Sequence, residues 1–221
     1  MVSIYAFNIK DIDDDDYKKF QSQVSLQRQN RAKHFRHFKD SVRCVCSELI
    51  LKYAYQRNLS PIKVGTNFYG KPYIMSDPHF NFNLSHSGDF VVCAVASTDV
   101  GVDIEKFSKI DVDALSEQLF TPDEQCILQS YTYLEKQAFF FKIWTAKESY
   151  VKCRGMGLNI ALNSFDVTED YIYTSEKKFT PYKLFRFVMD ETYQLTACSI
   201  DSLVDYNIKY IDHHSIIELI S

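Results

Sequence analysis

Two short segments of the chain carry carboxylates, and the second also carries lysines, in patterns that suit phosphate chemistry. In the first, residues 101–105 (GVDIE), acidic residues alternate with branched apolar ones. Side chains of a strand alternate between its two faces, so Asp103 and Glu105 would share one face while the residues beside them point into the core. Two adjacent carboxylates repel each other, and a divalent cation relieves that repulsion. This segment alone leaves a solvent-exposed strand end open as the alternative.

The second segment, residues 141–152 (FKIWTAKESYVK), has helical periodicity. Glu148 follows Trp144 by one turn, which places a carboxylate at the edge of an aromatic face, where an unpaired charge is unfavourable. Lys152 follows Glu148 by one more turn and could form a helical ion pair worth about 0.2–0.5 kcal/mol. Such a pair alone does not explain why it borders the apolar side. Three carboxylates from two elements suit Mg²⁺, which completes its octahedron with water and substrate phosphates.

A third feature is the basic segment 28–43, which contains six Arg or Lys residues and one Asp in a chain of net charge −4. If the segment were one continuous helix, four of these cations would share a face: Arg28, Arg31, Lys39 and Arg43. A solvated basic face and an anion-binding site both remain open. Arginine suits the second alternative because its guanidinium group binds phosphate oxygens in a bidentate manner. The candidates for an anion site are Arg28, Arg31, Arg43, Lys71 and His86.

Composition limits the class of protein. The chain has 221 residues, of which 46% are hydrophobic and 24% charged, as expected of a globular protein with a substantial core. The net charge of −4 gives no global attraction to nucleic acid or to an anionic membrane. No apolar stretch approaches the roughly 18 residues of a membrane span, and the N-terminus lacks a secretory pattern. We therefore expect a cytoplasmic protein whose six scattered cysteines stay reduced.

Periodicity predicts the elements that position these residues. We expect strands over 2–9, 81–84, 90–97, 100–105, 179–188 and 193–200, and helices over 41–57 and 137–154. Gly155 would end the second helix, residues 85–89 would form a turn, and the acidic run 11–16 would be a solvated turn. The strand at 90–97 is similar in pattern to the strand at 193–200.

This similarity predicts a pseudo-duplicated α+β fold. Each half would be a long helix packed on a small, mostly antiparallel sheet, with the active site in the cleft between the halves. Residues 1–99 would form the first half, and residues 100–221 would form the second.

The order of these motifs resembles the signature of a known family. The pattern G-x-D-x-E, followed after some forty residues by W-x-x-K-E-x-x-x-K, is typical of 4′-phosphopantetheinyl transferases, and residues 101–105 and 144–152 match it at every position. The blocks 69–72 (YGKP), 83–88 (NLSHSG) and 120–124 (FTPDE) resemble the larger, surfactin-synthetase-activating (Sfp-like) class. The resemblance extends from about Arg28 to Leu158.

The resemblance implies a monomer that binds coenzyme A between its halves. Residues 1–99 would contact the nucleotide and phosphates, and residues 100–221 would carry the metal ligands, the catalytic helix and the carrier docking surface. It would transfer the 4′-phosphopantetheine group to a serine of an apo acyl carrier or peptidyl carrier protein and release 3′,5′-ADP, in antibiotic or lipid biosynthesis. No nucleic acid or membrane partner is implied. The metal, Mg²⁺ with Mn²⁺ as a substitute, would lie on the pyrophosphate between Asp103, Glu105 and Glu148.

The resemblance also assigns the remaining residues of the site. The residues implied to hold the phosphates of the nucleotide are Arg28, Arg31, Arg43 and His86, with Ser85 and Lys71 lining that site. Lys152 would lie by the leaving oxygen, and Glu148 or Glu124 would take the serine proton. Lys147, one position off this face, would matter less than Lys152. Asp89 stands where some relatives carry a basic residue.

Two other classes of protein are alternatives. The tripeptide at residues 212–214 (DHH) is similar to part of one phosphoesterase motif, but the other aspartate motifs of a metal-dependent phosphohydrolase are missing. A non-catalytic coenzyme A-binding protein would not require three carboxylates.

Overall fold

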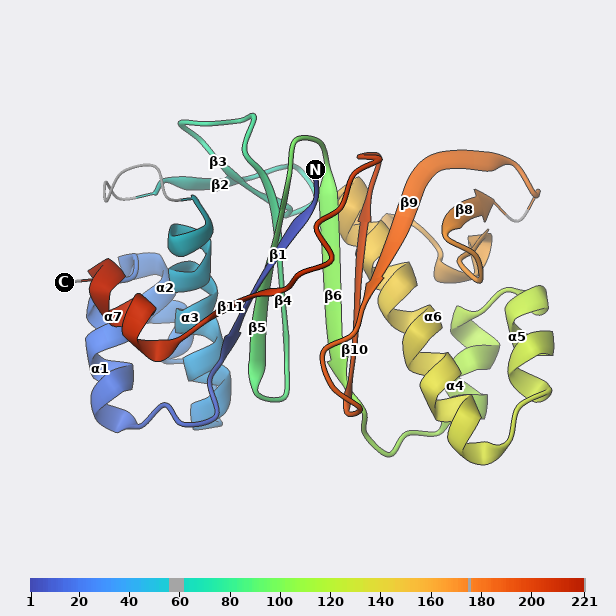
Figure 1. Cartoon of the computed structure of the whole chain (residues 1–221), viewed down its shortest axis with the longest axis horizontal. Coiled ribbons are helices and arrows are strands. Elements are labelled where there is room, and N and C mark those ends of the chain that lie inside the picture. The colour runs from blue at the N-terminus through green and yellow to red at the C-terminus, as the bar shows by residue number, and fades with distance from the viewer. Residues whose placement is uncertain (56–61, 175, 221) are drawn as a thin grey trace.

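The structure is a computed structural model that describes residues 1–55, 62–174 and 176–220. Figure 1 shows two sheets at the centre of the molecule, with helices covering the outer face of each. The helices are α1 (Asp14–Ser22), α2 (Leu26–Ala32), α3 (Phe38–Tyr55), α4 (Val112–Leu119), α5 (Pro122–Gln129), α6 (Tyr133–Arg154) and α7 (His213–Ile220). The strands are β1 (Ser3–Asn8), β2 (Val64–Thr66), β3 (Pro72–Ile74), β4 (Asn81–Ser87), β5 (Phe90–Ala96), β6 (Val100–Lys106), β7 (Phe165–Asp166), β8 (Tyr171–Thr174), β9 (Phe179–Phe187), β10 (Tyr193–Ser199) and β11 (Lys209–Ile211).

The two halves repeat one arrangement. In the first half, β5 lies between β1 and β4, antiparallel to both, and α3 packs on this sheet. In the second half, β10 lies between β6 and β9, again antiparallel to both, and α6 packs on the sheet. This confirms the expected α+β fold of two related halves and the two strands predicted over 179–188 and 193–200.

The core has three layers, which explains the apolar pattern shared by β5 and β10. Val91 faces α3 and its neighbour Val92 faces the second sheet, so both faces of β5 are buried. Leu195 of β10 likewise lies between the sheets, while Cys198 lies under α6. Strands buried on both faces are apolar throughout, and the two central strands therefore look alike.

Several boundaries differ from the expectations. Strand β4 continues through Ser87, so Ser85 and His86 lie in a strand, and the turn narrows to Gly88 and Asp89. Gly88 has a φ of 56°, a conformation that favours glycine. Helix α6 starts at Tyr133, before the predicted start, because Thr132 and Glu135 form a capping box. Gly155 ends this helix in the left-handed conformation, as predicted.

The N-terminal segment is more helical than expected. The acidic run is not a solvated turn: Asp13 caps α1, and the following aspartates form its first turn, where a negative charge is favourable. The basic segment 28–43 is not one helix, because α2 ends at Ala32 and α3 begins at Phe38. The last two residues of the predicted helix 41–57 lie outside the described residues.

The end of the chain returns to the first half. Strand β11 pairs in parallel with β1, and Ile211 and Ile216 are buried against the α3 layer. The predicted division of the chain into halves 1–99 and 100–221 stays a prediction. The segment of β11 and α7 belongs to the second range in sequence but packs on the first half. None of the described helices has the length and apolar composition of a membrane span.

Candidate active site

Helix α6 packs closely on strand β6 because Gly101 has no side chain. A Cβ atom at Gly101 would lie 2.0 Å from the Ser149 carbonyl oxygen and 2.3 Å from the Cys153 backbone nitrogen. The glycine of the GVDIE segment is therefore explained by close backbone approach. This contact brings the face of α6 that carries Glu148 and Lys152 onto the acidic residues of β6.

Asp103 is the centre of the resulting cluster and is 4% exposed. Its Oδ1 atom accepts hydrogen bonds from Lys152 Nζ at 2.5 Å and from Ser85 Oγ at 2.9 Å. Lys152 Nζ also donates to Ser85 Oγ at 3.1 Å. The second oxygen, Asp103 Oδ2, is buried and has no hydrogen-bond partner among the described residues. A buried carboxylate oxygen without a partner is unfavourable, so this atom is available to a ligand that the protein does not itself supply.

Strand β4 supports β6 with a row of polar side chains. Asn83, Ser85 and Ser87 alternate along β4 and lie on one face. Their side-chain oxygens accept hydrogen bonds from backbone N–H groups of β6 at 2.9, 3.4 and 3.0 Å, respectively. Ser87 also donates to Glu105 Oε2 at 2.8 Å. The sequence analysis missed Asn83 and Ser87, although polar residues at every second position indicate such a face.

Glu105 and Glu148 complete the acidic cluster, and both are half-buried. Burial raises the pKa of Glu105, and repulsion from Asp103 adds to this shift, while the Ser87 hydrogen bond opposes it. Burial also raises the pKa of Glu148, where Lys152 opposes the shift and the other two carboxylates add to it. The negative charges of the three carboxylates therefore influence one another.

The acidic cluster suits a cation that takes only part of its coordination from protein. Within the described ranges, no group of three or more His, Cys, Asp or Glu side chains is arranged so that it could hold a metal ion without rearrangement. Lys152 occupies one oxygen of Asp103, and the other oxygen is free of partners within the described structure. Mg²⁺ commonly binds one or two carboxylates and leaves its other positions to water and phosphate. The donor set present here fits that requirement.

Glu124 does not join the cluster. It is fully buried, and its carboxylate accepts hydrogen bonds from the backbone N–H groups of Thr121 at 2.8 Å and Val167 at 3.0 Å. It also forms an ion pair with Lys147, whose Nζ lies 2.8 Å from Glu124 Oε2. The structure argues against Glu124 as the general base because protein atoms enclose its carboxylate.

Arg43 and His86 lie near each other beside the cluster and form the Arg43–His86 corner. His86 lies between two serines of β4 that face β6, so its ring is on the opposite face, towards α3. Desolvation lowers the pKa of His86, and the positive charges of Arg43 and Lys152 add to the shift. Arg43 Nη1 lies 3.5 Å from Asp40 Oδ1. This nitrogen is buried and lacks a hydrogen-bond partner in the described part of the chain, which favours binding of an anion.

The other two arginines are placed differently. Arg28 lies on α2, where its Nε is 3.6 Å from Glu48 Oε2, and Arg31 is exposed on the same helix. No hydrogen bond or ion pair among the described residues joins either arginine to His86 or Arg43. Their contact with the nucleotide therefore stays a prediction.

A groove of about 270 Å³ opens beside Glu148 and Lys152. Its apolar lining includes Tyr69, Leu84, Val151, Ile160 and Leu162. Lys71 forms part of the wall, and its Nζ donates to the Cys153 carbonyl at 2.7 Å. Asn67 Nδ2 donates to the Gly155 carbonyl at 2.9 Å. These two residues of the first half thus cap the C-terminal end of α6 and fix one wall of the groove.

Comparisons with protein families identify the class of transferase that has this fold and site. A model described as "4′-phosphopantetheinyl transferase, N-terminal" matches residues 12–98, and a model of the 4′-phosphopantetheinyl transferase superfamily matches residues 99–198. The chain belongs to the 4′-phosphopantetheinyl transferase family. It transfers the 4′-phosphopantetheine group of coenzyme A to a serine of a carrier protein.

Individual relatives place the chain in the Sfp-like class. It is 38% identical to 4′-phosphopantetheinyl transferase gsp of Aneurinibacillus migulanus, over 83% of this chain and 79% of that protein. It is 32% identical to 4′-phosphopantetheinyl transferase psf-1 of Bacillus pumilus over 90% of each chain. It is 30% identical to 4′-phosphopantetheinyl transferase Sfp of Bacillus subtilis (strain 168), over 82% and 84%. These relatives confirm the family expected from the motifs, and none of them supports a phosphohydrolase or a non-catalytic coenzyme A binder.

Proposed function

We propose that the enzyme carries out this transfer at the acidic cluster, with Asp103, Glu105 and Glu148 holding Mg²⁺ and Lys152 beside the reacting phosphate. The observation that supports the proposal most strongly is Asp103. One of its oxygens is bound by Lys152 and Ser85, and the other is buried without a partner among the described residues. When bound, Mg²⁺ would neutralise pyrophosphate charge and stabilise the leaving oxygen.

The remaining chemistry belongs to side chains of the chain itself. The serine oxygen of the carrier forms a bond to the β-phosphorus of coenzyme A while the bond to the bridging oxygen breaks, and 3′,5′-ADP leaves. Lys152, already directed at the cluster, offsets the charge that develops on the leaving oxygen. Glu148 takes the serine proton. Glu148 lines the groove together with Lys152, which supports this role because a general base must lie within hydrogen-bond reach of the proton that it removes.

The phosphates of the nucleotide bind to the first half of the chain. Arg43 and His86 supply donors for the 3′-phosphate, and Ser85 and Lys71 line the approach. Arg28 and Arg31 add positive charge from α2. The apolar groove beside Glu148 takes an uncharged part of coenzyme A.

The acceptor is an apo acyl carrier or peptidyl carrier protein. The enzyme works as a monomer, because one chain supplies both pseudo-duplicated halves. Mn²⁺ serves as a substitute for Mg²⁺. All six cysteines are free thiols, which agrees with a reducing cytoplasm.

Metal dependence tests this proposal. Transfer to an apo-carrier, measured as a mass increase of the intact carrier, should stop in excess chelator and return when Mg²⁺ or Mn²⁺ is added back. Undiminished transfer in chelator would contradict the role of the three carboxylates as metal ligands.

A further inference from the structure

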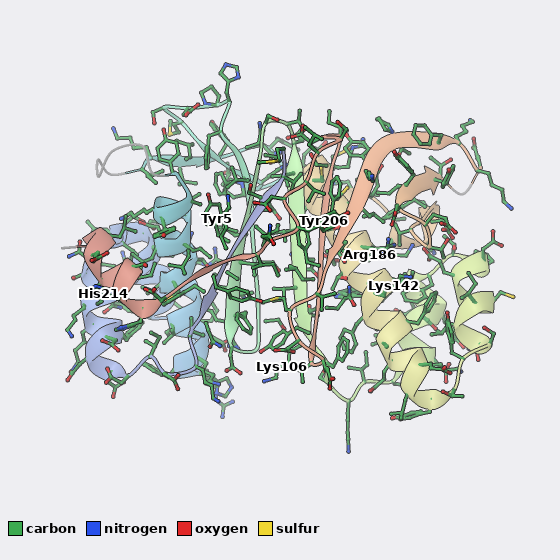
Figure 2. The ribbon with its side chains drawn as sticks, in the orientation of Figure 1. Tyr5, Lys106, Lys142, Arg186, Tyr206 and His214 are labelled. Carbon is green, nitrogen blue, oxygen red and sulfur yellow. The ribbon has the colours of Figure 1, made fainter. Side chains whose placement is uncertain are left out.

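The turn between β4 and β5 carries a carboxylate that binds a lysine from each half of the molecule. Asp89 Oδ1 lies 2.5 Å from Lys39 Nζ, at the start of α3. Asp89 Oδ2 lies 3.1 Å from Lys106 Nζ, at the end of β6. Figure 2 labels Lys106, which lies at the end of β6 near the turn between β4 and β5. The Asp89 side chain is 17% exposed, whereas those of Lys39 and Lys106 are 56% and 44% exposed.

The backbone holds Asp89 in place, and the two lysines come to it. The Asp89 N–H donates to Tyr193 Oη at 2.8 Å, and its carbonyl accepts from the Ile9 N–H at 2.8 Å. The preceding residue, Gly88, has no room for a side chain, because a Cβ there would lie 2.3 Å from Tyr193 Oη. The lysines reach Asp89 through long, exposed side chains, so they can exchange it for another anion.

Lys39 lies next to the Arg43–His86 corner, and Asp89 joins Lys106 to Lys39. Lys39 precedes Arg43 by one turn of α3, and Asp89 follows His86 by three residues. Arg43 retains a buried nitrogen without a hydrogen-bond partner in the described structure. An anion that enters this corner would therefore meet a partly unsatisfied guanidinium and two lysines already bound to an internal carboxylate.

We propose that Asp89 is a specificity-determining residue that competes with the 3′-phosphate of coenzyme A for Lys39 and Lys106. The inference rests on the proposed function, in which Arg43 and His86 hold that phosphate. Binding of the phosphate requires the lysines to leave Asp89, so the internal ion pairs weaken binding of every ligand that carries this group. The product 3′,5′-ADP carries the same phosphate, and Asp89 thereby favours its release.

The Asp89→Asn variant tests the proposal because it keeps the shape of the side chain and removes its charge. Equilibrium binding of coenzyme A, dephospho-coenzyme A and 3′,5′-ADP is measured by calorimetry with Mg²⁺ present. The freed lysines should tighten binding of coenzyme A and of 3′,5′-ADP by about 3- to 30-fold. Dephospho-coenzyme A, which lacks the 3′-phosphate, should bind as to the unaltered protein. The gain should shrink between about 50 mM and about 500 mM salt.

The direction of the effect separates this role from a structural one. Loss of a purely structural contact between the halves would weaken binding of all three ligands. Binding that is weaker or unchanged, or equally tighter for coenzyme A and dephospho-coenzyme A, would overturn the proposal. Replacing both lysines with Met in the Asp89→Asn background should abolish this gain. The affinity for coenzyme A should fall to that of the unaltered protein or below it.

A matched control is Asp113→Asn, which removes the partner of Lys136 from a 3.0 Å surface ion pair between α4 and α6. This variant should bind all three ligands normally. If the unaltered protein bound no coenzyme A, the proposed function itself would fail, and this inference with it. Normal binding by the unaltered protein together with no gain in Asp89→Asn would overturn the inference alone.

Discussion

At the scale of single residues, two lysines that are five positions apart in α6 have different surroundings. Lys152 lies on the face of α6 that meets β6, where its ammonium group binds Asp103. Lys147 lies on another face, is fully buried, and binds Glu124 and two backbone carbonyls. The motif W-x-x-K-E-x-x-x-K therefore contains one lysine that lies in the acidic cluster and one that lies in the core.

Substitution of the two lysines should give opposite results. Lys147→Met leaves Glu124 as an unpaired buried charge and should lower the free energy of unfolding by about 3–5 kcal/mol. Lys152→Met should lower the turnover number strongly and leave the midpoint of thermal unfolding nearly unchanged. Denaturant unfolding and single-turnover transfer measure the two effects. If Lys147→Met unfolded normally, the buried pair would not have the structural role assigned to it.

The charge of Asp103 should matter more than its volume. Asp103→Asn keeps the side-chain shape but removes the charge from the oxygen that lacks a partner, and turnover should fall on the order of 100-fold or more. Glu148→Gln should cause a comparable loss, because it removes both a ligand and the base. Glu117→Gln, at an exposed position of α4, is the control and should be active. Near-normal turnover of Asp103→Asn at saturating Mg²⁺ would refute the three-carboxylate site.

At the scale of secondary-structure elements, the site depends on how closely α6 approaches β6. Periodicity alone predicts both elements, since their motif residues have clear spacing. It does not predict that β4 extends through Ser87, because the residues around Gly88 have the composition of a turn. The short helices α1 and α2 also escape prediction, as each depends on one capping residue, Asp13 or Ser25.

The helix–strand contact can be tested through Gly101. Gly101→Ala adds a methyl group where the nearest backbone atom is 2.0 Å away, so α6 must move off β6. Overpacking of this kind typically destabilises a protein by about 1–3 kcal/mol. Because Glu148 and Lys152 move with the helix, the turnover number should fall much more than the affinity for coenzyme A. A variant that lost stability but transferred at the normal rate would show that this contact does not position the site.

At the scale of the whole molecule, the active site lies where the two halves meet. Strand β4 of the first half and β6 of the second share side-chain hydrogen bonds, and the Asn67–Lys71 turn caps α6. The similarity of β5 and β10 was enough to predict the duplication. It could not reveal that β11 and α7 return to the first half, since parallel pairing with β1 depends on contacts between distant parts of the chain.

The carboxylates at this junction should make stability depend on pH and on Mg²⁺ together. Burial and mutual repulsion raise the pKa of Glu105 and Glu148 in the folded protein. The folded protein therefore binds these protons more tightly than the unfolded chain, and stability is lost as pH rises through the raised values. Mg²⁺ should offset this loss, so the rise in melting temperature that it causes should be large near pH 7 and vanish towards about pH 4.

Thermal unfolding with Mg²⁺, compared with a monovalent salt at equal ionic strength, measures this effect without any transfer reaction. The Glu148→Gln variant should show a much smaller shift. A shift that did not depend on pH, or that persisted in the variant, would place the ion elsewhere on the protein.

The most direct test of the account is the mass of an apo-carrier protein after incubation with this enzyme, coenzyme A and Mg²⁺. The account predicts that the carrier gains the mass of one phosphopantetheine group. It predicts no gain when the acceptor serine is replaced by alanine or when the enzyme carries Asp103→Asn. Failure of the unaltered enzyme to modify any carrier in a panel of acyl and peptidyl carriers, or equal modification by the Asp103→Asn variant, would contradict it.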